Sequence, residues 1–432
     1  MKWFPTHKGF AAGIVVVGYG SGALISAPLF QWLLKLYRTP PTFLGSLDQV
    51  SVVANESGRL FVDSQEVVVA TLTDCKNTFD GILEPGVYLI NTGSTGVAQA
   101  FMTLGIGYSL IMAMAAFSYR LPPSNLFQVD KNKVEVFTSK HPELTLTEAT
   151  RTKQFALLYA SFISANCGAY ALISSSKLIL GSSFPHLSSE TMTAFVAGTS
   201  IANLTGRLFY PNLSDYFVLK SQHEAFIARN RVYGIMWGFA APLGYLGILT
   251  AIHSRHYSLL AEPIRLGLFC GSTFLIISSF GGSTATRPAV VSDLFGNNNS
   301  AALTARQLSG VLPSAMLGPR MVAYFSEHSN RDELEKLVGL IPDETFQQAF
   351  GGASRDNLQT LIDRKTITIP RVLELCPPGT VDPSPFIFDN ALICAGGLTI
   401  LGYLLNRQIN PLLHFQNQQA FGAKADNNKS TP

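Results

Sequence analysis

The chain has 432 residues, of which 47% are hydrophobic and 14% charged, with a net charge of +3 and a mean hydropathy of +0.24. Soluble domains carry about 25% charged residues, so much of this protein's surface should face something other than water. The small net charge, dispersed along the chain, argues against a nucleic-acid partner.

Eight apolar stretches are long enough to cross a hydrocarbon core of ~30 Å, which takes about 20 residues of helix. They are residues 10–36, 92–118, 154–176, 187–212, 232–253, 263–285, 301–324 and 386–406. The chain is therefore predicted to be an all-α, polytopic protein embedded in a lipid bilayer. The first stretch is rich in glycine and has a small-xxx-small spacing from Gly18 to Gly22, which lets membrane helices approach closely. The seventh is the least apolar because it contains Arg306.

Two long polar links, 37–91 and 325–385, contain runs with the composition of strands, such as Glu-Val-Val-Val-Ala at residues 66–70. Both links are expected to fold, and with eight spans they lie on the same side of the membrane. Basic residues gather on the opposite side, in residues 1–9, 119–153 and 213–231. Basic residues mark the cytoplasmic side, so both termini should lie in the cytoplasm and the two long links outside.

Residue patterns that would support catalysis are missing from the sequence. The histidines are scattered, there is no phosphate-binding loop, and the cysteines have no metal-ligand spacing, so neither an enzyme nor a cofactor is expected. Cys75 and Cys376 both fall in the outer links and could pair. Asn55 begins a glycosylation sequon in the first of these links.

Three motif-bearing stretches, residues 2–22, 203–215 and 281–296, carry a resemblance that hydropathy alone does not. In order, they resemble the entry to the fifth helix, the end of the eighth helix with its following loop, and the connection from the tenth to the eleventh helix. These are features of the oxalate:formate antiporter and monocarboxylate transporter families of the major facilitator superfamily. The resemblance implies a major facilitator-type helix bundle in which the eight spans are helices 5–12 of the usual twelve.

The resemblance also implies a division of the chain. Residues 1–118 would be a remnant of the N-terminal half, 119–153 the central cytoplasmic loop, 154–406 the six-helix C-terminal half and 407–432 a cytoplasmic tail. The first four helices of the family would be missing, although transport by alternating access needs both halves. Both a truncated chain and a genuine eight-helix product stay open.

Arg207 is the first candidate for substrate binding. It precedes Asp215 by eight residues, which places it about 12 Å inside the membrane from that loop. An arginine near the bilayer centre costs at least about 2.5–3.5 kcal/mol, so it should face a cavity and an anionic partner. A guanidinium can hold a carboxylate through two hydrogen bonds, and the resemblance puts Arg207 where the antiporters keep a substrate-binding arginine. The alternative is that Arg207 extends to the interface or pairs internally.

Arg306 is the second candidate. Its Thr-Ala-Arg context resembles the eleventh helix, where the antiporter has a substrate-binding lysine. The alternative is an arginine at the cytoplasmic end of its helix. Asn203 and Gln307 could hydrogen-bond the substrate or bridge helices.

Three further charged residues are expected near the cytoplasmic face. Arg287 and Asp293 would order the link between the tenth and eleventh helices. Asp215 would take part in a charge lock between helices that opens during the transport cycle.

These observations predict a secondary transporter of small organic anions, mono- or dicarboxylates, that works by alternating access. Exchange is favoured over proton coupling because no carboxylate or histidine lies well inside a span. The alternative is a non-transporting membrane scaffold or receptor whose long outer links bind a partner. Substrate identity and oligomeric state stay open.

Overall fold

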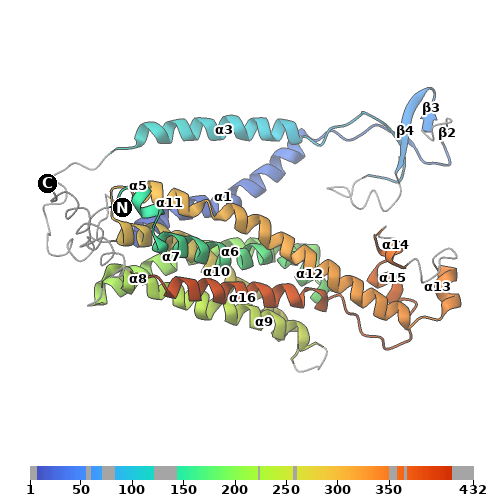
Figure 1. Cartoon of the computed structure of the whole chain (residues 1–432). Helices are drawn as coiled ribbons and strands as arrows, with labels where there is room; N and C mark the ends of the chain where they lie inside the picture. Colours follow the sequence, from blue (N-terminus) through green and yellow to red (C-terminus); the bar gives the residue numbers. More distant parts are fainter. Residues whose placement is uncertain are drawn as a thin grey trace, which may run out of the picture. The chain divides into compact units, whose positions relative to one another are not determined.

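The computed structural model describes residues 7–54, 60–70, 83–120, 144–221, 224–255, 260–349, 358–363 and 367–410 (Figure 1). The chain forms two compact units. The smaller comprises Gly22–Leu121, and the larger comprises Met1–Ser21 with Pro122–Pro432. Each of the eight predicted spans coincides, apart from a few residues at its ends, with one long helix or with consecutive helices, so the prediction of an all-α, polytopic bundle is confirmed.

In the smaller unit, two apolar helices are joined by a small antiparallel sheet. The helices are α3 (Val97–Ser118) and the part of α1 (Lys8–Tyr37) that follows Ser21. The sheet has the strand order β1-β5-β4-β3-β2, with β1 Phe43–Gly45, β2 Val53–Ala54, β3 Leu60–Val62, β4 Gln65–Ala70 and β5 Gly86–Leu89. Strand β4 contains the predicted strand at residues 66–70. It pairs with β3 across a turn in which Asp63 and Ser64 both have positive φ, the geometry that suits the twist of a two-residue hairpin.

The larger unit is a helix bundle. Its long helices are α6 (Lys153–Ser183), α7 (Ser189–Lys220), α10 (Glu262–Phe295), α12 (Val311–Gly339) and α16 (Asp389–Arg407). Another long helical segment consists of α8 (Ala225–Tyr233), a π-helical stretch η2 (Gly234–Ala240) and α9 (Ala241–His253). Short helices complete it: α5 (Leu146–Thr150), α11 (Ser300–Leu308), α13 (Asp343–Ala349), α14 (Leu358–Asp363), α15 (Ile369–Leu373) and the 3-10 turn η4 (Phe386–Phe388).

Five helical segments of the described residues are long and apolar enough to cross a membrane. They are Val97–Ser118, Lys153–Ser183, Ala225–His253, Glu262–Phe295 and Phe386–Arg407. The remaining predicted spans correspond to α1, with a shorter apolar stretch at Gly9–Gly18, and to α7 and α11–α12, which carry several charged side chains.

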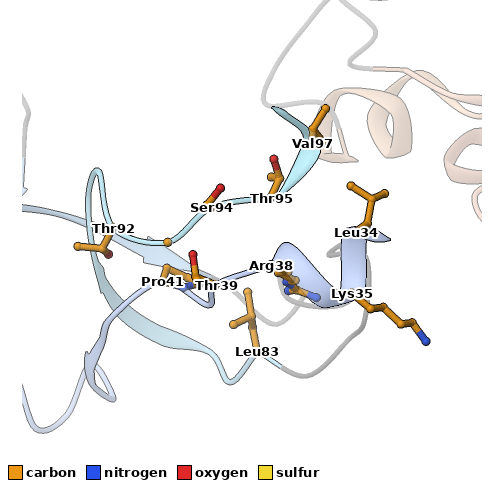
Figure 2. A pocket seen from close by; sticks show the side chains of 11 residues that line it. Leu34, Lys35, Arg38, Thr39, Pro41, Leu83, Thr92, Ser94, Thr95 and Val97 are labelled. Carbon is orange, nitrogen blue, oxygen red and sulfur yellow. The ribbon is translucent and has the colours of Figure 1, made fainter. Parts of the chain in front are cut away.

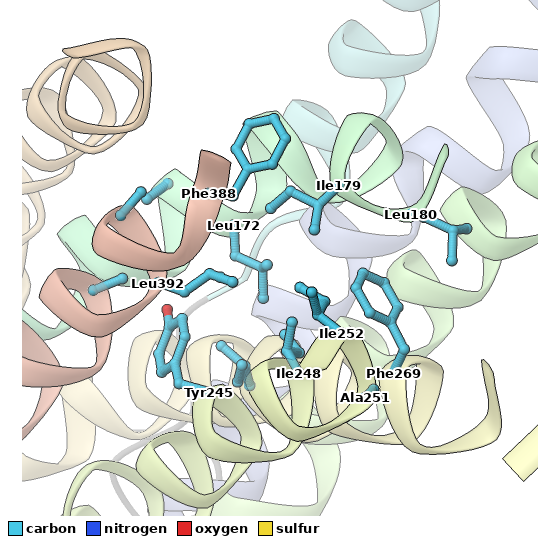
Figure 3. Packing of buried hydrophobic residues seen from close by; sticks show 14 of the residues in the cluster. Leu172, Ile179, Leu180, Tyr245, Ile248, Ala251, Ile252, Phe269, Phe388 and Leu392 are labelled. Atoms are coloured by element: carbon cyan, nitrogen blue, oxygen red, sulfur yellow. The ribbon is translucent and has the colours of Figure 1, made fainter. Parts of the chain in front are cut away.

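Apolar packing between α6, α7, α9, α10 and α16 forms the main core of the larger unit. Leu172 of α6, Ile248 of α9 and Phe269 of α10 are buried in one cluster (Figure 3). Leu392 of α16 belongs to the same cluster. Helices that meet lipid on their outer side gain little from the hydrophobic effect, so close packing must hold them together.

The described parts of the second long link, residues 325–349, 358–363 and 367–385, are folded, as expected. Helix α12 continues to Gly339, and with α13–α15 it encloses a separate small core that includes Leu334, Phe346 and Val372. Cys376 lies beside this core as a free thiol, with its sulfur 3.6 Å from the carbonyl oxygen of Leu337. Cys75 and Asn55 lie outside the described residues.

Candidate functional site

Arg207 lies inside α7 and is 4% exposed. Its Nε donates a hydrogen bond to Oδ1 of Asn203, one helical turn earlier, at 2.6 Å. Its Nη1 donates to the backbone carbonyl of Val16 in α1 at 2.9 Å. Two of its hydrogen bonds therefore end on neutral oxygens, one from its own helix and one from α1.

Helix α1 packs on α7 through two glycines. A Cβ atom on Gly13 would lie 2.7 Å from the carbonyl oxygen of Arg207, and a Cβ on Gly9 would lie 2.6 Å from that of Pro211. The close approach is thus at Gly9 and Gly13. The spacing noted in the sequence, Gly18 to Gly22, makes no such contact, since a Cβ atom on either glycine would have nothing within 4 Å.

Asp215 is buried in α7, which continues to Lys220, so the expected loop after residue 212 is helix. Its two carboxylate oxygens accept from the backbone amides of Gly9 and Phe10, at 3.1 and 2.9 Å. These amides belong to the first turn of α1, where unpaired N–H groups and the helix dipole favour a negative charge.

Arg229 of α8 joins this carboxylate to a second one. Its Nη1 lies 2.5 Å from Asp215 Oδ1 and its Nε lies 2.7 Å from Asp293 Oδ2 of α10. Nη1 also donates to the hydroxyl of Ser214 at 2.8 Å. The Arg229 side chain has no exposed surface, and the cluster ties α7, α8 and α10 together at the end of α7 that also receives α1.

Arg287 and Asp293 do not lie in a link, contrary to the sequence expectation. Helix α10 continues through both residues to Phe295. Gly281, Gly282 and Pro288 would break a helix in water, but neighbouring helices support them here. Asp293 therefore orders a helix junction through Arg229, and Arg287 is buried inside the bundle.

Arg306 and Gln307 lie in α11, whereas Arg207 lies in α7. The Arg306 side chain is exposed. Gln307 is buried, and its Nε2 donates to the carbonyl of Phe155 in α6 at 3.1 Å. This bond links α11 to α6, which is the bridging arrangement left open by the sequence.

The smaller unit has a pocket of its own, with a volume of about 540 Å³. It lies where the last turn of α1 meets the loop before α3, and Lys35, Arg38, Ser94 and Thr95 are among its lining residues (Figure 2). No acidic side chain is among the described residues that line it. The pocket has the size of a small-molecule site.

Two known proteins are similar to this chain over most of its length, although no protein-family model matches it. The uncharacterized MFS-type transporter YhjX of Escherichia coli is 25% identical over 304 residues, which are 70% of this chain and 53% of YhjX. The oxalate:formate antiporter of Oxalobacter formigenes is 24% identical over 305 residues, 69% of this chain and 51% of the antiporter. The chain is a relative of major facilitator superfamily transporters.

This relationship and the apolar helices together make the chain an integral, multi-pass membrane protein. Its relatives are transporters and not enzymes. The chain spans about half the length of the curated relatives that it matches. Transport activity, which belongs to the full-length relatives, is therefore a proposal for this chain.

Sequence reasoning missed Arg229, which it counted only among the basic residues of a cytoplasmic link. The residue lies at the edge of an apolar stretch and its partner Asp293 is 64 positions away, so no local pattern marks the pair. A count of acidic against basic residues near the span ends could have pointed to it. Asp215 and Asp293 are two acids near span ends, and buried acids require a basic partner.

Proposed function

We propose that the chain forms part of a secondary transporter that binds a small mono- or dicarboxylate at Arg207 and moves it by exchange. The observation that carries this proposal is the buried guanidinium of Arg207, with described hydrogen bonds to two neutral oxygens. A carboxylate can replace such acceptors with charge-assisted bonds, which are roughly twice as strong. The 24% identity to an oxalate:formate antiporter supports the same class of substrate.

Asn203 and Arg306 have different parts in this proposal. Asn203 orients the Arg207 guanidinium through its Oδ1 atom and could turn its amide to the substrate. Arg306, exposed on α11, would supply a second positive charge for a dicarboxylate. Gln307 holds α11 on α6 and so positions Arg306.

The contacts of α1 offer a route from binding to movement. Helix α1 is bonded to α7 at two levels, through Val16 to Arg207 and through Gly9 and Phe10 to Asp215. A carboxylate on Arg207 would compete with the Val16 carbonyl and leave α1 held mainly by Asp215. The cluster of Asp215, Arg229 and Asp293 would then act as the charge lock that opens on the cytoplasmic side.

Exchange is favoured over proton coupling for a physical reason. Asp215 and Asp293 lie inside helices, and both are ion-paired with Arg229, at 2.5 and 2.7 Å. Both carboxylates thus belong to the junction of α7, α8 and α10, which fits a charge lock between helices better than a proton carrier.

A non-transporting receptor or scaffold is the second candidate. It is favoured by the 540 Å³ pocket of the smaller unit and by the separate core formed by α12–α15. Both would serve a protein that recognises a ligand or partner outside the membrane. Such a protein would have no use for a carboxylate site at Arg207.

Equilibrium binding to the purified full chain tests the proposed site. Titration calorimetry with oxalate should show saturable binding to the wild type. Arg207→Lys, which keeps the charge and loses the two-bond geometry, should weaken binding by about tenfold, and Arg207→Ala by about 100-fold. Arg320→Ala removes an exposed arginine of α12 and is the matched control. Equal affinity in the wild type and both Arg207 variants would place the site elsewhere.

A further inference from the structure

Arg287 is a buried arginine held by aromatic rings. It has no exposed surface, and its guanidinium carbon lies 4.4 Å from the ring centre of Phe162, 5.3 Å from that of Tyr233 and 5.6 Å from that of Trp237. Its Nη1 donates to the carbonyl of Leu158 at 3.1 Å. Its Nε and Nη2 atoms are buried and have no hydrogen-bond partner among the described residues.

The charge of Arg287 is therefore not directly paired with a described carboxylate, in contrast to that of Arg229. Arg229 lies against two carboxylates, whereas no described carboxylate lies within 4.0 Å of Arg287. Aromatic faces attract a cation through their quadrupole, but a ring carries no net charge. The positive field of Arg287 therefore extends into the surrounding bundle.

A special backbone segment builds this aromatic cage. Trp237 lies in the π-helical stretch η2, and Tyr233 directly precedes that stretch. π-Helical segments are rare in proteins, and those that do occur are often found at functional sites. Gly238 of η2 lies against the ring of Tyr403, so α16 also packs on this segment. Rings from α6 and α8–η2 thus enclose a cation of α10.

Arg287 lies close to the proposed carboxylate site. Helices α7 and α10 touch where Gly281 meets the backbone of Asn203, the residue that holds Arg207. Arg287 is six residues further along α10, which is a rise of about 9 Å. Arg207 is four residues further along α7 from the same contact, so both arginines lie within about two helical turns of it.

We propose that Arg287 is a specificity-determining residue that favours anions of higher charge without touching them. The inference rests on the proposed function and goes beyond it by naming the preferred substrate class, small dicarboxylates. For a charge about 10 Å from the ligand and an effective dielectric constant of about 20, Coulomb's law gives a roughly tenfold stronger binding of a monoanion. Because the energy is proportional to ligand charge, the effect on a dianion is roughly 100-fold.

This proportionality provides the test. Oxalate, a dianion at pH 7, and formate, a monoanion, are titrated into the purified full chain carrying Arg287→Met or Arg287→Lys. Arg287→Met removes the charge and should lower the preference for oxalate over formate by about tenfold. Arg287→Lys keeps the charge and should retain the wild-type preference. A packing defect would weaken both anions by the same factor, and that result would overturn the inference.

A second pair of variants keeps the arginine in place. Phe162→Glu sets a carboxylate beside Arg287 and should lower the oxalate preference as Arg287→Met does, whereas Phe162→Gln should not. An unchanged preference in Phe162→Glu would also overturn the inference, even if Arg287→Met fails to fold. The failure of the proposed function looks different, because the wild type itself would then bind neither anion at Arg207.

Discussion

Arg229 illustrates how this bundle keeps a charge away from water. Two carboxylates and one hydroxyl surround the guanidinium, and the remaining charge of Asp215 faces the first amides of α1. Arg207 has a neutral environment in its described bonds, and Arg287 an aromatic one. The three arginines share a side chain but differ in the groups that their described contacts reach.

Replacing Arg229 by Met tests the role of the charge cluster. The substitution leaves two buried carboxylates without their arginine. Breaking a buried ion pair in this way lowers the free energy of unfolding by about 3–5 kcal/mol. The variant should therefore unfold at a clearly lower temperature in detergent. A triple variant with Asp215→Asn and Asp293→Asn added should recover part of that loss. Equal stability of Arg229→Met and wild type would contradict the ion-pair geometry.

Glycine determines how closely the helices approach. The α7–α10 crossing brings Gly206 against the backbone of Ser278, with no room for a Cβ atom. Gly9 and Gly13 do the same for α1 on α7. Because α7 bears Arg207 and Asp215, these contacts hold both charged residues in register with α1 and α10.

The glycine at the α7–α10 crossing can be tested against a control on α10. Gly206→Ala forces the two backbones apart and should destabilise the protein by about 1–3 kcal/mol, as overpacking does. Gly271→Ala has open space around its Cβ and should be neutral or slightly stabilising, since alanine is the better helix former. Thermal unfolding of the two variants gives the comparison. A similar effect of both substitutions would contradict the close crossing.

At the scale of the whole molecule, hydropathy predicted the helices well and their boundaries less well. A single sequence shows where apolar stretches lie, but not where a helix continues beyond the membrane. Helix α12 extends to Gly339 because residues such as Leu334 gain a core of their own with α13–α15. Helix α10 continues past Pro288 because neighbouring helices support it. The strand run at residues 66–70 was predictable because β-branched residues dominate it.

The candidate site was predictable where one residue stands out locally. Arg207 is conspicuous because it interrupts an apolar stretch. The cluster around Arg229 and the cage of Arg287 consist of residues from separate helices, and only the folded chain brings them together. In the same way, two identical glycine spacings in α1 differ only in whether a neighbouring backbone is present.

Exchange across a membrane is the most direct test of the central claim, that this chain forms part of a carboxylate transporter. The full chain is reconstituted into liposomes loaded with formate, and the entry of labelled oxalate is followed with and without the internal anion. We predict saturable entry that requires internal formate and is lost in Arg207→Ala, while Arg320→Ala behaves as the wild type. Binding of oxalate that is not followed by exchange and is unchanged in Arg207→Ala would contradict transport by this chain and favour a receptor.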